Sequence, residues 1–165
     1  MLNSNHTIRC LPEAIEAFTL FARIEGRSPK TIQTYHVAFQ DLTGFLGSSN
    51  VELLQLTSGD FRRWIETRLN EDYSKVTINI RLRALRAFFN WLVQEGYLQQ
   101  SPLEQVKQLR VPKQYPYVLA EIQVQALLKA IDRNTWTGKR NWAIVLTLLD
   151  TMLRRSELTH LGCVH

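Results

Sequence analysis

Apolar residues recur at three- and four-residue intervals along most of the chain, which is the spacing of the buried face of an α-helix. The first such segment covers 12–24 and is followed by Gly26. The second begins at Ser28 and Pro29, a capping residue and a proline suited to the first helical position, and continues to Gly47. The pattern therefore predicts two amphipathic helices in the first 47 residues.

Two further helices are expected before residue 100. The third starts with a cap at Thr57 or Ser58 and runs to Leu69. The fourth extends from 75 to 94, and its apolar positions follow a near-heptad pattern. The predicted core positions of this helix are Ile78, Leu82, Leu85, Phe89 and Leu92.

The stretch LRVPKQYPYV at 109–118 interrupts the helical pattern. Its two prolines and weak periodicity predict a linker between two units. Beyond it we expect an amphipathic helix over 120–131, a turn around 134–139 and a buried helix over 142–149. The expected fold is all-α, with a first domain at 1–108, the linker, and a second, mainly helical unit at 119–165.

Composition is that of an ordinary globular protein, with 45% hydrophobic and 21% charged residues. The apolar run at 143–149 is far shorter than the roughly 20 residues of a membrane span. An export signal consists of a basic flank followed by an apolar run, and the amino terminus lacks this pattern. We therefore expect a cytoplasmic protein with no membrane partner.

The net charge is +5 and the isoelectric point is near 9.5. The basic excess grows along the chain, from four residues of each sign in 1–50 to seven basic and four acidic residues in 111–165. A modest excess suits nucleic-acid binding but also suits many proteins that bind none, so the local pattern has to decide.

A polar stripe lies along the fourth predicted helix, opposite its apolar face. It consists of Asn79, Arg83, Arg86 and Asn90, with Arg81 beside them. Arginine and asparagine on a helix can reach base edges and phosphates in the major groove. The alternative is a solvated outer face, since arginine is a good helix former. No acidic residue interrupts the stripe before Glu95, and this favours nucleic-acid binding.

Polar and basic residues also cluster where the second predicted helix begins. They are Arg27, Ser28, Lys30, Thr31 and Thr34. Free backbone N–H groups and hydroxyls at a helix amino terminus bind phosphate well. The alternative is helix capping alone, since Ser-Pro helix starts are common.

The sequence lacks the usual patterns of a metal or cofactor site. Cys10 and Cys163 lie at opposite ends without metal-ligand spacing, and two free thiols are favoured over a disulfide in a chain without an export signal. There is no HExxH motif, no Ser/His/Asp arrangement and no glycine-rich phosphate loop. We expect no metal and no cofactor.

Three segments of the chain resemble the tyrosine recombinases, the phage-integrase and Xer-like family. SPKTIQTYHVAFQDLTGFL and KVTINIRLRALRAFFNWLVQEGYLQQSPLEQV are similar to the second and fourth helices of the family's SAM-like core-binding domain. RVPKQYPYVLAEIQVQALLKAI resembles the entry into the catalytic domain. LLDTMLRRSELTHL is similar to the family box T-G-x-R-x-S-E-L, in which the arginine is catalytic.

The resemblance implies roles for residues of this box. Arg154 takes the place of the first catalytic arginine, whose guanidinium would hold the non-bridging oxygens of a scissile DNA phosphate. Glu157 would brace the site. Met152 departs from the family's glycine, so a bulky residue stands where a tight backbone is usual.

The 165 residues stop within the first part of the family's catalytic domain. The family's later lysine, its second His/Arg box, the following His or Trp and the tyrosine nucleophile all come after the point that Arg154 marks. Without that tyrosine, no phosphotyrosyl intermediate can form, so we expect this chain alone to be catalytically inactive.

The expected function is DNA binding by the amino-terminal part of a tyrosine recombinase, with double-stranded DNA and other recombinase protomers as partners. The alternative is a non-catalytic helical module that pairs with full-length recombinases. The expected DNA contacts are Lys30, Thr31, Thr34, Lys75, Thr77, Asn79, Arg81, Arg83, Arg86 and, in the linker, Lys113.

Overall fold

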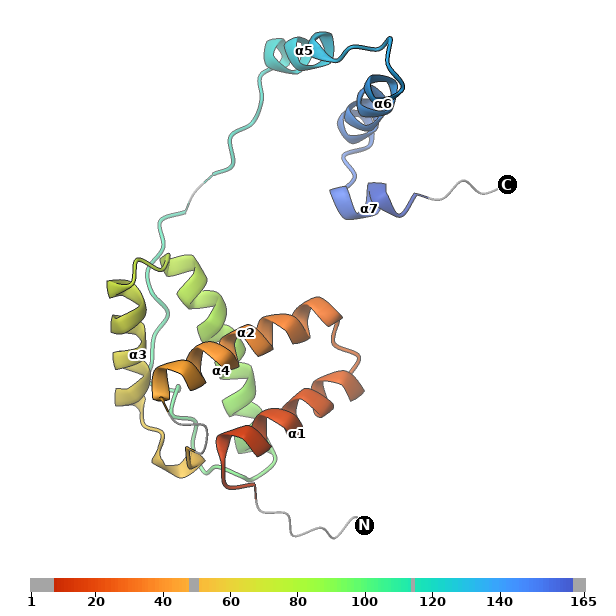
Figure 1. Ribbon diagram of the computed structural model, residues 1–165. Coiled ribbons are helices and arrows are strands. Elements are labelled where there is room, and N and C mark those ends of the chain that lie inside the picture. Colours follow the sequence, from red (N-terminus) through yellow and green to blue (C-terminus); the bar gives the residue numbers. More distant parts are fainter. Residues whose placement is uncertain (1–7, 48–50, 114, 162–165) are drawn as a thin grey trace. The chain divides into compact units, whose positions relative to one another are not determined.

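The computed structural model describes residues 8–47, 51–113 and 115–161, whose regular secondary structure is helical (Figure 1). Within these residues there is no β-strand, only an isolated bridge between Cys10 and Glu52. The expected all-α class is confirmed. The elements are α1 (Leu11–Ile24), α2 (Pro29–Leu46), the 3-10 turn η1 (Leu53–Gln55), α3 (Ser58–Asn70), α4 (Lys75–Gln94), α5 (Glu121–Ala130), α6 (Trp136–Thr151) and α7 (Arg155–Thr159).

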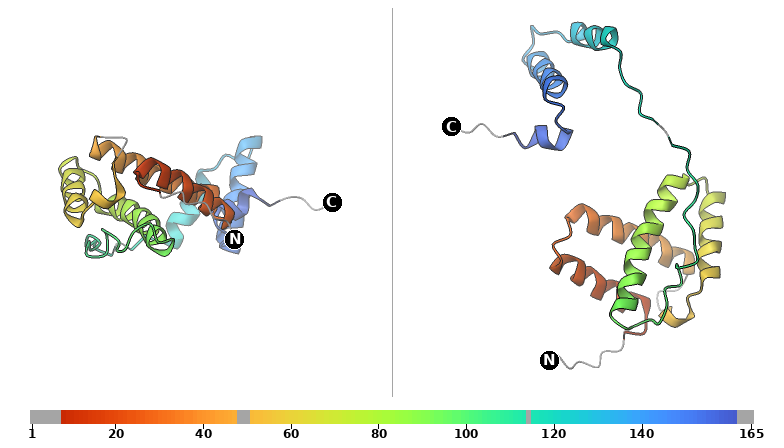
Figure 2. Two further views of the ribbon diagram at one scale, coloured as in Figure 1. Left: turned by 90° about the horizontal axis from the view of Figure 1, so that it is seen from below. Right: turned by 180° about the vertical axis from the view of Figure 1, so that it is seen from behind.

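The chain divides into two compact units, Met1–Pro112 and Lys113–His165. In the first unit α1 and α2 form an antiparallel pair that packs across α4, while α3 packs against α4 from another side (Figures 1 and 2). Helix α4 therefore contacts each of the other three helices and is the centre of this unit.

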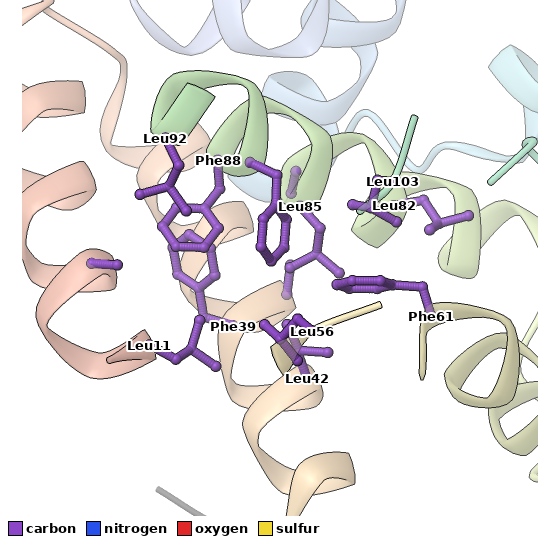
Figure 3. Packing of buried hydrophobic residues seen from close by; sticks show 14 of the residues in the cluster. Leu11, Phe39, Leu42, Leu56, Phe61, Leu82, Leu85, Phe88, Leu92 and Leu103 are labelled. Atoms are coloured by element: carbon purple, nitrogen blue, oxygen red, sulfur yellow. The ribbon is translucent and has the colours of Figure 1, made fainter. Parts of the chain in front are cut away.

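The core of the first unit is built around the apolar face of α4. Leu82, Leu85, Phe88 and Leu92 are fully buried and point toward the other helices (Figure 3). Phe88 is the hub of an aromatic cluster, with ring centroids 5.4 Å from Phe18 and 5.0 Å from both Phe39 and Phe89. These edge-to-face arrangements are the favoured geometry for aromatic pairs, so they fix the angles at which α1 and α2 meet α4.

A nearly buried ionic network joins α2, α3 and α4. The Asp41 carboxylate accepts a hydrogen bond from Trp64 Nε1 at 3.0 Å and lies 2.8 Å from Arg68 Nε and 2.9 Å from Arg81 Nη1. The side chains of Asp41, Arg68 and Arg81 are only 9%, 11% and 14% exposed. Tyr73 completes the network, because the Arg81 guanidinium lies 4.6 Å from the centre of its ring.

Arg68 shows how this network balances burial against charge. Burial opposes the charged guanidinium, but the hydrogen bond to Glu71 at 2.5 Å and the charge of Asp41 outweigh it, so the pKa of Arg68 is raised above its ordinary value. Arg68 also donates to the Asp41 carbonyl at 3.1 Å. Arg68 therefore stays charged and holds α3 against the carboxyl-terminal half of α2.

The segment after α4 turns back and runs along that helix (Figure 2). Leu103 and Val106 are buried in the common core, and Leu109 packs against it. This segment forms turns rather than a regular helix, as the hydrogen bonds from Glu104 N to the Ser101 carbonyl and from Val106 N to the Leu103 carbonyl show.

The second unit begins its longer helix earlier than the sequence pattern predicts. Helix α6 starts at Trp136, where the Thr135 hydroxyl accepts a hydrogen bond from Gly138 N at 3.0 Å. The expected turn at 134–139 is thus largely helical. A Cβ at Gly138 would lie 1.7 Å from the Asp132 carbonyl oxygen, so this close approach requires glycine. Helix α7 was not expected.

Helix α6 ends in a left-handed residue. Met152 has φ 53° and its N–H donates to the Leu148 carbonyl at 3.1 Å. A residue with a Cβ loses roughly 1 kcal/mol or more in this conformation, whereas glycine does not. Met152, which stands where the recombinase-like box has glycine, thus adopts a left-handed conformation that glycine accepts without strain.

We expect Asp41→Asn to lower the free energy of unfolding of the first unit by about 3 kcal/mol, since it leaves two nearly buried guanidiniums without a full counter-charge. Urea denaturation followed by tryptophan fluorescence measures this loss. Glu66→Gln, at an exposed acidic position of α3, is the control and should change stability by less than about 0.5 kcal/mol. Equal stability of the two variants would contradict the role of Asp41.

We expect Met152→Gly to stabilise the end of α6 by about 1 kcal/mol, because it relieves the left-handed backbone strain. Amide hydrogen exchange near Leu148 and Met152 should slow by about fivefold. Met152→Ala keeps a Cβ at the same φ and is the control, so exchange in that variant should stay at the wild-type rate. Slower exchange in both variants would show that side-chain size, not backbone strain, matters.

Candidate nucleic-acid interface

A groove between α2 and α4 brings together several residues that the sequence singles out. Its volume is about 240 Å³ and we call it the α2–α4 groove. Of the expected DNA contacts, Lys30, Thr34, Thr77 and Arg81 line it. None of the described residues that line it is acidic. The full lining is Lys30, Gln33, Thr34, Val37, Thr77, Ile80 and Arg81.

The two helices begin with the same cap. Ser28 Oγ accepts a hydrogen bond from Thr31 N at 3.2 Å, and Ser74 Oγ accepts one from Thr77 N at 3.1 Å. In each cap the serine and threonine hydroxyls also pair, at 2.9 Å and 2.8 Å. Ser28 therefore caps α2, and the threonine hydroxyls contribute to both caps.

Exposed cations surround these caps. Lys30, Lys75 and Arg83 are all exposed, and Lys30 Nζ donates to Gln33 at 3.3 Å. The sequence has no Asp or Glu in 29–40 or in 75–94, and the acidic residue that follows in α2, Asp41, belongs to the ionic network. The outer sides of α2 and α4 therefore carry positive charge that no acidic residue of those stretches offsets.

Part of the predicted polar stripe holds the chain's own backbone. Asn79 Nδ2 donates to the Leu109 carbonyl at 2.9 Å, and Asn79 Oδ1 accepts from Leu109 N at 2.9 Å. Arg86 donates to the Val106 carbonyl. We call these contacts the α4 clip. Arg81, in the ionic network, is likewise engaged inside the unit, so of the stripe's arginines Arg83 is the one on the exposed outer face.

In the second unit, Arg154 and Glu157 form a local pair. Arg154 N donates to Glu157 Oε2 at 2.8 Å, and Arg154 Nη1 lies 3.1 Å from Glu157 Oε1. The Arg154 side chain is 84% exposed, so its guanidinium has free directions for another anion. In the linker, Lys113 is exposed and its ammonium lies 5.0 Å from the centre of the Tyr115 ring.

Sequence reasoning missed the apolar members of the groove. Val37 and Ile80 line it, and neither was predicted as a core residue or as a site residue. Val76, Ile80 and Arg83 are spaced at i, i+4 and i+7, so they share one face of α4. From that spacing, an outer face of α4 with both apolar and basic side chains could have been predicted.

Other kinds of site find little support in the part of the chain that the structure describes. These residues contain no group of three His, Cys, Asp or Glu side chains that could hold a metal ion. None of the described helices has the length and apolar character needed to cross a bilayer. Cys163 lies outside the described residues.

The chain matches known proteins along most of its length. Residues 15–96 match the family model described as phage integrase, N-terminal SAM-like domain. The chain is 31% identical over 138 residues to tyrosine recombinase XerD of Proteus mirabilis, which covers 84% of this chain and 44% of the relative. It is 32% identical over 149 residues to tyrosine recombinase XerA of Pyrococcus furiosus, covering 90% of this chain and 47% of the relative.

Among solved structures, a lambda integrase dimer bound to a COC' core site has a similar fold. The TM-score is 0.62 at 12% identity, over 77% of this chain and 35% of the integrase chain. The chain thus spans somewhat less than half the length of the recombinases that it matches. The matched SAM-like segment contains α1 to α4 almost entirely, together with the α2–α4 groove. The chain belongs to the tyrosine recombinase family.

Proposed function

We propose that this chain is the DNA-binding amino-terminal part of a site-specific tyrosine recombinase, and that the outer face of α2 and α4 lies on duplex DNA. The proposal includes a division of labour between a core-binding domain at 1–108, a linker at 109–118 and the beginning of a catalytic domain at 119–165. Double-stranded DNA is the first partner, and other recombinase protomers are the second.

The observation that carries the proposal is the one-sided charge of two adjacent helices. Lys30, Lys75 and Arg83 are exposed there, and the groove between the helices adds hydroxyls from Thr34 and Thr77. Cations and hydroxyls are the groups that contact DNA phosphates. The lack of interleaved acidic residues supports DNA binding over a solvated face, because a solvated helix usually alternates the two signs.

In the second unit, the proposal gives Arg154 the role of phosphate ligand. Its guanidinium has five N–H donors, and Glu157 contacts only the Nη1 side of the group. Glu157 would hold the side chain in place while the remaining donors face a phosphate. Covalent chemistry is outside this proposal, which concerns the binding of DNA alone.

A second candidate function is a helical interaction module. In the described residues of the second unit, Gly138 is the buried position, while Ile122, Trp136 and Met152 are exposed. Exposed apolar groups on this scale favour a covering partner. Such a module would need no DNA affinity of its own, which separates it from the first candidate.

The salt dependence of DNA binding is the slope of the logarithm of the binding constant against the logarithm of the salt concentration. We expect Lys30→Gln, Lys75→Gln and Arg83→Gln each to reduce this slope by about one, since each removes one phosphate contact. Fluorescence anisotropy of a labelled duplex of about 20 base pairs, repeated across a salt series, measures the slope. Arg9→Gln makes the same chemical change at an exposed position before α1, far along the chain from both helix caps, and should leave the slope unchanged.

Two results would count against DNA binding by this face. An unchanged slope in all three variants would remove α2 and α4 from the interface. An absence of measurable affinity in the unaltered chain at low salt would favour the interaction module instead.

A further inference from the structure

The centre of the proposed DNA face is apolar. Val37 is 43% exposed and Ile80 is 39% exposed, and both line the α2–α4 groove. Val76, one turn before Ile80 on the same side of α4, is 51% exposed. A surface that contacts only phosphates has no use for branched apolar side chains, and leaving them in water is unfavourable. Their position between the cations therefore needs a reason.

Three of the long polar side chains of α4 that could read bases by hydrogen bonds are engaged elsewhere. Both ends of the Asn79 amide are bonded to Leu109, and Arg86 is bonded to the Val106 carbonyl. Arg81 is held by Asp41 and lies over Tyr73. Bidentate contacts of arginine to guanine or of asparagine to adenine would require these interactions to break. Besides Lys30, the Gln33 amide and two threonine hydroxyls, the groove offers exposed methyl groups.

We propose that the α2–α4 groove reads DNA sequence through methyl contacts, with the side chains of Val37 and Ile80 packed against the C5-methyl groups of thymine. This inference rests on the proposed function, because it assumes that the face lies in the major groove. Thymine is the one base that presents a methyl group there, so apolar contact distinguishes it from the other three.

Charge complementarity selects duplex DNA as the occupant of the groove. Lys30 lines the groove itself, and Arg83 follows Ile80 on the same face of α4, so cations flank the apolar centre. A peptide partner matched to the apolar residues would need acidic side chains for the cations, whereas a thymine-containing duplex supplies both methyls and phosphates. The cations would fix the position of the protein on the duplex, and the methyl contacts would supply the preference for thymine.

The experiment compares two labelled duplexes of alternating A·T pairs, one with thymine and one with uracil in its place. Uracil differs from thymine only by the missing methyl, so phosphate contacts and hydrogen-bonding edges are kept. We expect the full chain to bind the thymine duplex about tenfold more tightly, since two methyls packed against the surface side chains contribute about threefold each. The salt slope should be equal for the two duplexes.

The double variant Val37→Ala, Ile80→Ala is expected to bind both duplexes equally, near the uracil affinity of the unaltered chain. Leu54→Ala, at an exposed leucine of η1, is the matched control and should keep the tenfold preference. Thermal unfolding of the variants checks that the fold is intact, and exposed positions should shift the midpoint little.

The outcomes separate this inference from the proposed function. Equal binding of both duplexes by the unaltered chain overturns methyl readout but leaves DNA binding in place. A preference that persists in the double variant also overturns it, because the preference then comes from DNA shape or another surface. Failure to bind either duplex at low salt overturns the proposed function itself.

Discussion

Asp41 is the constraint on which the first unit depends. One carboxylate receives an indole N–H and two guanidiniums, and through them it ties α2 to α3 and α4. Charged groups this far from water are tolerated only when they are paired, so removal of any one member exposes the others to the full penalty of burial. The network therefore specifies how the three helices meet, while the aromatic cluster around Phe88 supplies apolar burial.

The polar side chains of α4 differ in what they contact, and the ionic network accounts for one of these contacts. Arg81 lies on the side of the helix that meets α2, Asn79 and Arg86 lie on the side that meets the returning chain, and Arg83 lies between them on the outer face. One helix thus carries three kinds of polar side chain, for helix packing, for chain routing and for solvent or a partner. Only the last kind can contact a partner without disturbing the fold.

Sequence periodicity was sufficient for the four helices of the first unit and for the core of α4. It missed α7, and the helix expected to be buried over 142–149 is half-buried or exposed within its unit. All five predicted core positions of α4 are buried, and α2 begins and ends as its capping signals indicate. The roles within the polar stripe could not be predicted, because the partner of Asn79 is a backbone group thirty positions away in a segment without periodicity. The early start of α6 was missed for a related reason, since Gly138 signals a turn in sequence but serves a close backbone approach in space.

The α4 clip sets the length of the tether between the two units. From Leu109, where the clip holds the backbone, to Glu121, where α5 begins, the chain can extend over 110–120, at most about 40 Å. In general, when two linked modules bind one ligand, a short tether raises the local concentration of the second module and so increases the overall affinity. Opening the clip would lengthen the tether toward the end of α4, so a half-buried asparagine that bonds to a distant backbone group sets the reach of the linker.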